Sequence, residues 1–383
     1  VVNHQGCVIR KPFGLVDFNG PGGGGQLGRM FCTAARNMGY QLHVFDPDPD
    51  SPAGQIADDH IEAAYIDELA LDYLARTCDV ITTEFENIPA ESMRTLASLR
   101  PVFPAADVIE IAQNRNKEKA FAQRAGLTPA PNHPVFDEAD LDAAIEITGL
   151  PAILKTATLG YDGKGQYVVE SLEQARAALQ ANAGAECVLE SKIELEKEIS
   201  VIVARNQRGE TAVYPVAENE HRNGILHISI VPARIDDVIR DKARSQALRL
   251  VDALDYVGVL AVEFFLDNRQ QLLFNEMAPR PHNSGHYTKD GCVTSQFEQQ
   301  VRVICGLPRG DVSLVSPVVM VNLLGDLWDP DWRVLLNEPN VKLHLYGKKE
   351  ARAGRKMGHY NVLDNDLDRA LETANRIYSA LAA

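Results

Sequence analysis

The pattern of apolar and polar positions predicts alternating strands and helices in the first part of the chain. From residue 19 a glycine-rich loop, a helix and a short strand ending at Asp46 follow one another, and the alternation continues to about residue 110. The run CDVITTEFENI predicts a buried strand whose carboxyl end carries three polar side chains, Glu84, Glu86 and Asn87. Ligands of open parallel sheets gather at such strand ends. The first eighteen residues have no clean period, so little is assigned to them.

Two apolar segments later in the chain predict a β-hairpin. YVGVLAVEFFLD contains Glu263, the turn sequence DNRQQ follows, and the next segment contains Glu276. Opposite side chains of an antiparallel pair come within about 5 Å of each other. Two carboxylates placed in this way suit Mg²⁺, which takes one or two carboxylates together with nucleotide phosphates. The alternative is a pair of solvated glutamates on an exposed face of the sheet.

Between these regions the pattern predicts a helix in NRNKEKAFAQRAG, a strand in LPAILKT and a loop in TLGYDGKGQ. The strand carries Lys155 near its end, where a buried lysine needs an anionic partner and an exposed one does not. The loop has three glycines in six positions and contains Lys164. It is not a Walker loop, and it suits either closure over a triphosphate or a plain polar turn.

Two further stretches contain charged candidates. Glu190 and Glu198 bracket a polar interruption between apolar runs, which suits contacts to adenine and ribose and equally suits an ordinary charged loop. His282 and His286 have the i, i+4 spacing of a zinc pair, but Pro281 and Gly285 prevent the helix that would align them.

Residues 23–28 satisfy G-x-G-x-x-G ahead of a helix, with Asp46 after the next strand, which is the pattern of dinucleotide binding. A helix that starts in a glycine-rich turn offers free N–H groups and a positive dipole end to any phosphate. The pattern therefore indicates a phosphate site, and it leaves open a nicotinamide cofactor or a purely structural turn.

Composition narrows the class of protein. The 383 residues are 45% hydrophobic and 24% charged, which is typical of a globular chain with more than one domain. A formal charge of -15 argues against nucleic acid as a partner. An anionic substrate would need local positive charge, which Lys348, Arg355 and Lys356 offer, although such a cluster is more commonly a solvated basic turn. Six scattered cysteines, no targeting segment and no run of eighteen apolar residues predict a reduced cytoplasmic protein that does not bind membranes.

Five motifs in one order give the chain a close resemblance to a known family: GGGQLGRM, TTEFENI, LGYDGKGQ, NEMAPRPHNSGHYT and HLYGK…GRKMGH. They resemble the ATP-grasp ligases, and within them the purine-biosynthetic carboxylases of aminoimidazole ribonucleotide. The resemblance covers nearly everything from residue 20. It implies an α/β protein with an ATP-grasp fold, a Rossmann-like N-terminal domain and a small C-terminal domain. The divisions we expect are 1–110, 111–187, 188–310 and 311–383.

The resemblance also implies a reaction and a set of residues. ATP phosphorylates bicarbonate, and the carboxyphosphate, directly or through carbon dioxide, carboxylates the exocyclic amine of aminoimidazole ribonucleotide. Mg²⁺ is expected on Glu263 and Glu276. ATP is expected beside Arg115, Lys155, Gly163, Gln166, Glu190, Glu198 and Asn275. The reacting groups are expected beside Tyr161, Asp162, Lys164, Arg280, His282, Asn283 and Ser284. The ribonucleotide is expected beside Gly25, Gln26, Leu27, Glu86, Lys348, Arg355 and Lys356. The resemblance further implies a homodimer.

Three other hypotheses use part of the same pattern. A related ATP-grasp ligase that acylates another amine, such as a formate-using enzyme of glycinamide ribonucleotide, does not need the HNSGH match. A Rossmann dehydrogenase explains the glycine loop but leaves Glu263 and Glu276 without a role. An inactive nucleotide-binding regulator keeps the fold and predicts no turnover.

Overall fold

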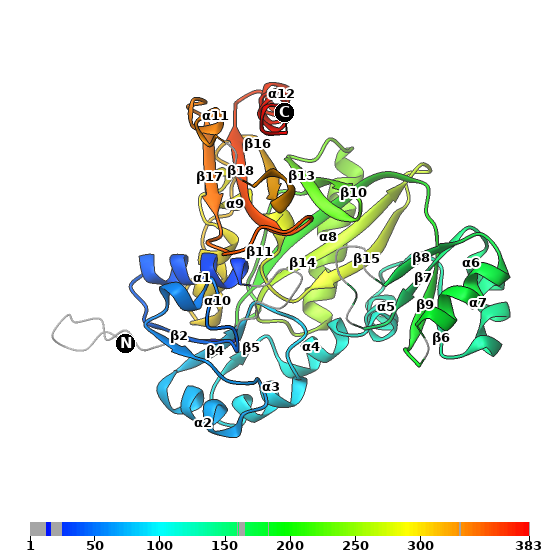
Figure 1. Cartoon of the computed structure of the whole chain (residues 1–383), viewed down its shortest axis with the longest axis horizontal. Helices are drawn as coiled ribbons and strands as arrows, with labels where there is room; N and C mark the ends of the chain where they lie inside the picture. Colours follow the sequence, from blue (N-terminus) through cyan, green and yellow to red (C-terminus); the bar gives the residue numbers. More distant parts are fainter. Residues whose placement is uncertain are drawn as a thin grey trace.

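The computed structural model describes residues 13–16, 25–158, 160, 165–182, 184–328 and 331–382. The predicted loop residues Tyr161, Asp162, Gly163 and Lys164 lie outside this part of the chain. Three β-sheets organise the described residues. Figure 1 shows one near the N-terminus, a long one through the middle of the molecule and a smaller one to the side with its own helices. None of the described helices combines the length and apolarity needed to cross a membrane.

The N-terminal sheet is parallel and has the strand order β3-β2-β1-β4-β5. Its strands are β1 (Phe13–Val16), β2 (Leu42–Phe45), β3 (Asp59–Ile61), β4 (Val80–Thr83) and β5 (Val102–Phe103). Its helices are α1 (Gln26–Asn37), η1 (Gly54–Ile56), α2 (Glu68–Thr77), α3 (Ala90–Ala97) and α4 (Ala106–Ala112). The first eighteen residues, to which the pattern assigned little, contain β1, the central strand of this sheet. Four residues are too few to show a period.

Helix α1 begins directly after Gly25, which has the left-handed φ of 86°. A Cβ at this position would lie 2.6 Å from Cδ of Pro52. The chain can therefore turn into α1 at this point only with glycine, and the free N–H groups of the first helical turn face the region between the sheets.

We expect Gly25→Ala to lower the free energy of unfolding by about 2 kcal/mol, because the substitution adds a clash to an unfavourable φ. Gly149→Ala is the matched control, since Gly149 has a φ of 66° but a Cβ added there would meet nothing within 4 Å. Urea unfolding of both variants checks the prediction. An equal loss in the two would show that Pro52 moves aside freely.

The smaller sheet is antiparallel, with the order β6-β9-β7-β8. It contains β6 (Asn132–Val135), β7 (Ala152–Thr156), β8 (Gln166–Val169) and β9 (Cys187–Ser191). The helices of this region are α5 (Arg115–Arg124), η2 (Glu138–Asp140), α6 (Leu141–Thr148) and α7 (Leu172–Ala181). Apolar residues of α6, α7 and the sheet form a core of their own, which includes Leu141, Leu154 and Leu189. Strand β9 runs past the expected division at 187/188.

The central sheet has nine strands and continues from residues 195–278 into the C-terminal residues 318–363. Its strands are β10 (Leu195–Arg205), β11 (Thr211–Val213), β12 (Ala217–Arg222), β13 (Ile225–Val231), β14 (Gly258–Asp267), β15 (Leu272–Ala278), β16 (Val318–Leu324), β17 (Val341–Leu345) and β18 (Lys356–Leu363). The connecting helices are α8 (Asp237–Ala253), η3 (Asn283–Gly285), α9 (Thr288–Gly291), α10 (Gln296–Ile304), η4 (Gly325–Leu327), α11 (Arg333–Leu336) and α12 (Leu367–Leu381). The pairing of β13 with β16 makes the sheet continuous.

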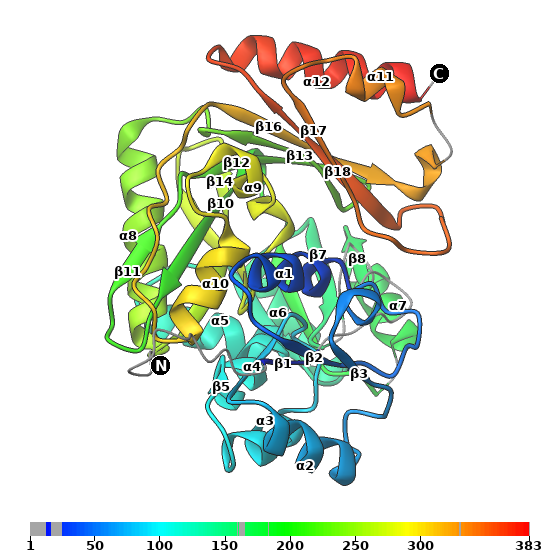
Figure 2. The same cartoon turned by 90° about the vertical axis from the view of Figure 1, so that its left-hand side faces the viewer.

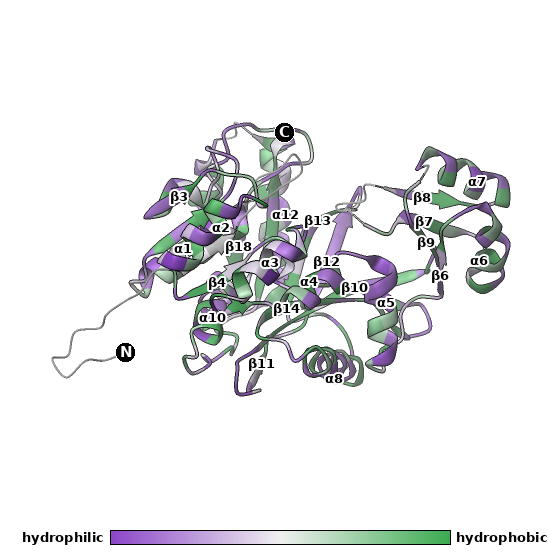
Figure 3. Cartoon of the chain, turned by 90° about the horizontal axis from the view of Figure 1, so that it is seen from below, coloured by the Kyte–Doolittle hydropathy of each residue, from purple (hydrophilic) through white to green (hydrophobic). Residues whose placement is uncertain are grey.

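The helices lie on the sheets as their sequences predict. Figure 2 shows α12 along the C-terminal strands and α10 beside α1. In Figure 3 α1, α6 and α8 carry both purple and green along their ribbons, as helices with one buried side do. The largest core joins Phe31 of α1 to Ile202 of β10 and Phe297 of α10, so the N-terminal and central sheets share one interior.

Candidate functional site

A cavity of about 750 Å³ opens where the three sheets meet. Its walls come from the start of α1, the carboxyl end of β4, helix α5, strand β7 and the β14–β15 hairpin. Fifteen predicted residues line it: Gly25, Gln26, Leu27, Glu86, Arg115, Lys155, Gln166, Glu198, Glu263, Asn275, Glu276, Arg280, His282, Asn283 and Lys356. Residues far apart in the sequence therefore share one space.

Four other described candidates lie outside the lining of this cavity: Glu190, Ser284, Lys348 and Arg355. Glu190 and Ser284 are buried behind residues that do line it. Lys348 is also buried, on the loop between β17 and β18. Next to it, the carbonyl of Gly347 accepts a hydrogen bond from the Gln55 amide, so this loop packs against the segment that follows β2.

The two predicted metal ligands face each other across the hairpin. Glu263 of β14 is the direct cross-strand partner of Glu276 of β15. Burial and the neighbouring charge of Glu276 raise the pKa of Glu263 to about 8. Two carboxylates held in this way repel each other, and a divalent cation would offset that repulsion.

The rest of the coordination would have to come from a ligand. No group of three or more His, Cys, Asp or Glu side chains within the described ranges is arranged to hold a metal ion. Mg²⁺ commonly completes its octahedron with substrate phosphates and water. The donor set therefore fits Mg²⁺ bound together with a nucleotide. Arg115 donates to Oε2 of Glu276 over 3.0 Å and brings positive charge to the same place.

Behind the cavity lies a buried ion cluster. Glu190 Oε2 is 2.8 Å from Lys155 Nζ, and Glu190 Oε1 is 3.1 Å from Lys119 Nζ. Lys119 also donates to the backbone carbonyl of Asn275 over 3.1 Å. Burial alone would raise the pKa of Glu190, but the two lysines outweigh burial and lower it to about 2. The cluster fixes Lys155, which is 6% exposed, at the edge of the cavity.

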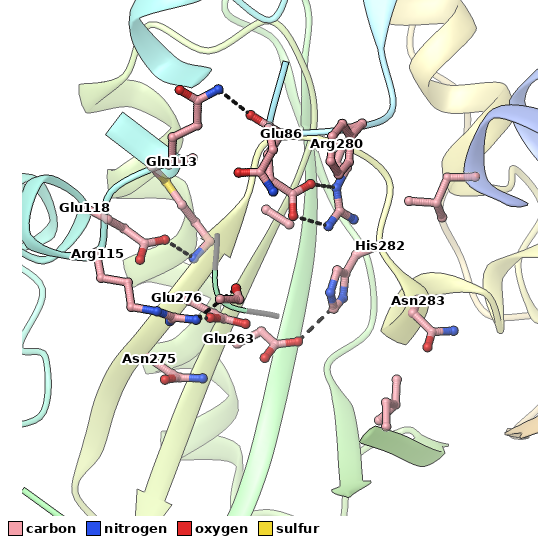
Figure 4. Close-up of a pocket in the computed structure, with 18 of the residues that line it drawn as sticks. Glu86, Gln113, Arg115, Glu118, Glu263, Asn275, Glu276, Arg280, His282 and Asn283 are labelled. Carbon is pink, nitrogen blue, oxygen red and sulfur yellow. Dashed lines mark hydrogen bonds and ion pairs between the residues drawn. The ribbon is translucent and has the colours of Figure 1, made fainter. Parts of the chain in front are cut away.

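Arg280 and Glu86, which the resemblance assigned to different ligands, form a two-pronged ion pair. Nε and Nη2 of Arg280 donate to the two carboxylate oxygens of Glu86. Burial would raise the pKa of Glu86, but Arg280 outweighs it and lowers the value. Figure 4 shows this pair at one side of the cavity, with Glu263 and Glu276 at the other. The pair ties the end of β4 to the segment after β15.

The HNSGH segment is held by hydrogen bonds on several sides. The side-chain amides of Asn283 and Asn322 bond to each other over 3.0 and 2.7 Å, which anchors η3 to β16. Burial lowers the pKa of His282 well below its ordinary value, so the ring is neutral. His286 is fully buried and faces the aromatic rings of Phe297 and Tyr346.

Among the residues of the cavity wall that sequence reasoning missed are two with charged contacts, His221 and Glu118. His221, at the end of β12, has Nδ1 2.9 Å from Oε2 of Glu198. Glu118 of α5 accepts the backbone N–H of Met277 over 2.6 Å, and burial together with the charge of Glu276 raises its pKa to about 8. The spacing from Arg115 to Glu118 puts both on one face of a helix, which was a usable signal. His221 has no such signal.

Asp46 does not have the role that a dinucleotide fingerprint gives it. The residue is fully buried, and its carboxylate accepts the backbone N–H of Asp48 over 2.8 Å. Burial raises its pKa to about 7. It closes the turn after β2, so it is not available to ribose hydroxyls, and the geometry argues against the dehydrogenase hypothesis.

Three family models match the chain in succession. Residues 20–113 match the ribonucleotide synthetase preATP-grasp domain, residues 120–297 the ATP-grasp domain, and residues 318–373 the phosphoribosylaminoimidazole carboxylase C-terminal domain. These matches cover most of the described residues.

Whole proteins are similar as well. An N5-carboxyaminoimidazole ribonucleotide synthase of Bacillus subtilis is 46% identical over 353 residues, which are 90% of this chain and 91% of that protein. One from Brucella melitensis is 48% identical over 339 residues, 88% of this chain and 93% of that protein. A solved N5-carboxyaminoimidazole synthase of Aspergillus clavatus, in complex with ADP and 5-aminoimidazole ribonucleotide, is 31% identical with a TM-score of 0.88, covering 97% of this chain and 98% of that one.

Proposed function

Since the chain belongs to the ATP-grasp ligases, and within them to the N5-carboxyaminoimidazole ribonucleotide synthases, we propose that it uses ATP and bicarbonate to carboxylate the exocyclic amine of 5-aminoimidazole ribonucleotide. The products are 5-(carboxyamino)imidazole ribonucleotide, ADP and phosphate. One observation carries the proposal. A single cavity contains the paired carboxylates, the lysine and arginine expected for a nucleotide, and the N-terminus of α1.

The first step transfers the γ-phosphoryl group of ATP to an oxygen of bicarbonate, giving ADP and carboxyphosphate. Lys155 and Arg115 lie on the side of the cavity where the ATP phosphates are expected, and both are positively charged donors. Glu263 and Glu276 would hold Mg²⁺, which supplies charge neutralisation on those phosphates. The cluster of Glu190 and Lys119 keeps Lys155 in place.

In the second step the amine nitrogen of the ribonucleotide forms a bond to the carboxyl carbon, the bond from that carbon to the phosphate oxygen breaks, and the amine loses a proton. In the alternative route carboxyphosphate first breaks down to phosphate and carbon dioxide within the cavity, and the amine nitrogen then forms its bond to carbon dioxide and loses a proton. Arg280 supplies positive charge for an anionic carboxyl or phosphate group, and Glu86 holds its guanidinium group in place through Nε and Nη2. Gly25, Gln26 and Leu27 offer N–H groups to the ribonucleotide phosphate.

ADP release tests the proposal. Purified protein with Mg²⁺, ATP and bicarbonate is expected to release ADP much faster when freshly prepared aminoimidazole ribonucleotide is added. Omitting bicarbonate should abolish the stimulation. Glycinamide ribonucleotide with formate serves as the comparison for a related ligase. Stimulation by that pair, or none by either, would overturn the proposed substrate.

A further inference from the structure

A chain of buried hydroxyl and amide groups leads across the central sheet to His282. Ser229 of β13 donates to Oδ1 of Asn219 over 2.8 Å, and Nδ2 of Asn219 donates to Oγ of Ser200 over 2.9 Å. Oγ of Ser200 lies 2.8 Å from Oγ of Ser284, which lies 2.9 Å from Nδ1 of His282. All four residues before the histidine are at most 5% exposed. Such a chain is shielded from water and has a defined geometry.

One contact fixes the direction of every hydrogen bond in this chain. The backbone N–H of Ser284 points at Nδ1 of His282, with a nitrogen–nitrogen distance of 3.3 Å. A backbone N–H can only donate, so Nδ1 is an acceptor and carries no proton. The hydroxyl of Ser284 then donates to Nδ1 as well, and it accepts from Ser200, which accepts from Asn219. The hydrogen bonds then all run from Ser229 toward His282, and Nδ1 is shared by the backbone N–H and the hydroxyl of Ser284.

The rival arrangement has a proton on Nδ1 that points to Glu263. Nδ1 of His282 is 3.5 Å from Oε1 of Glu263, against 2.9 Å from Oγ of Ser284. The longer distance is outside the usual range of an N–H···O hydrogen bond. A proton on Nδ1 would also face the N–H of Ser284. Both considerations favour Nδ1 as the acceptor.

The other ring nitrogen is directed to the cavity. The His282 side chain lines the cavity and is 18% exposed, and all of its hydrogen bonds to described residues are made through Nδ1. A neutral imidazole without a proton on Nδ1 has its proton on Nε2. Nε2 therefore presents an N–H to whatever binds in the cavity.

We propose that Ser200, Asn219 and Ser229 are positioning residues that, through Ser284, lock His282 in the tautomer with the proton on Nε2, so that His282 acts as a hydrogen-bond donor. For the chemistry this inference depends on the proposed function. The Nε2–H then donates to an anionic oxygen of the carboxyl group being transferred. Because Nε2 already carries a proton, His282 does not remove the proton that the amine loses.

NMR of the full-length protein labelled with ¹⁵N-histidine tests the tautomer without any turnover. His282→Gln removes one of ten histidine signals and so assigns it. Long-range ¹H–¹⁵N couplings are expected to show a protonated Nε2 and a bare Nδ1 at that residue. A proton on Nδ1 would overturn the proposal. A wild-type enzyme with no turnover would overturn the proposed function and leave the tautomer result standing.

Kinetics of variants test the positioning. Ser200→Ala interrupts the hydrogen-bond chain. We expect kcat to fall on the order of 10-fold while KM for ATP stays within about twofold. In part of the His282 population the proton should move to Nδ1. Ser200→Thr keeps the hydroxyl and should recover most of kcat. Ser191→Ala is the control, because Ser191 lies on β9 of the smaller sheet and its hydroxyl donates to the backbone carbonyl of Thr148 in α6. If Ser200→Ala folds poorly, Ser229→Ala takes its place. Wild-type kcat with an unchanged His282 signal would contradict the proposal.

Discussion

Glu276→Ala is expected to lower magnesium-dependent ATP turnover on the order of 1000-fold while leaving the protein folded. The substitution removes one of the two carboxylates that face each other in the hairpin, and Arg115 loses the oxygen to which it donates. Metal stabilisation of transferring phosphoryl groups contributes several kcal/mol, which sets the scale of the loss. ADP release across a Mg²⁺ titration measures the effect. Thermal melting shows whether the fold is retained.

Glu196→Ala is the matched control for Glu276→Ala. Glu196 is an exposed glutamate of β10 in the same sheet, and its carboxylate accepts from Gln270 in the turn of the hairpin. Its loss changes the net charge equally and should leave both turnover and the Mg²⁺ requirement unchanged. Wild-type magnesium dependence in Glu276→Ala would show that the metal assignment is wrong.

Glu190→Ala is expected to lower the free energy of unfolding by about 4 kcal/mol, because it leaves Lys119 and Lys155 buried without their shared counter-charge. Glu190 is 1% exposed, so water does not replace the lost carboxylate. Urea unfolding at neutral pH measures the loss. Glu146→Ala, an exposed glutamate of α6, is the control and should change little.

The same cluster predicts how the loss depends on pH. The pKa of Glu190 in the folded protein is about 2, below the value of roughly 4.3 for an unfolded glutamate. Its contribution to stability is therefore complete above the unfolded value and declines as the pH falls toward 2. The difference between wild type and Glu190→Ala should be about 1 kcal/mol smaller at pH 3.5 than at pH 6. A constant difference would mean that the two lysines do not lower this pKa.

The sequence predicts those parts of the site that depend on local pattern. Two apolar runs and a turn sequence were enough to predict the hairpin. In the structure this hairpin places Glu263 opposite Glu276. The helix α5 and the polar end of β4 followed in the same way from short-range periodicity. Each of these elements fixes its own side-chain directions once its period is known.

Long-range pairings were not predictable in this way. Arg280 and Glu86 are 194 positions apart, and nothing local to either one indicates the other as its partner. The pairing of β13 with β16 also joins segments far apart, and it makes the C-terminal strands part of the central sheet. The hydrogen-bond chain from Ser229 to His282 requires β10, β12 and β13 to pair in one specific register. The sequence shows the small polar residues within these apolar strands, but it does not show which residues are their hydrogen-bond partners.

The interior shared by α1, β10 and α10 affects how the protein folds. Phe31, Ile202 and Phe297 belong to one cluster, so residues 25–113 by themselves would expose the apolar side of α1 to water. The smaller sheet, with α6 and α7, has a separate core and no such dependence. The three family models match three successive segments of the chain. The units that unfold cooperatively should not coincide with these segments. The N-terminal and central sheets should melt together, and the smaller sheet should be able to open alone.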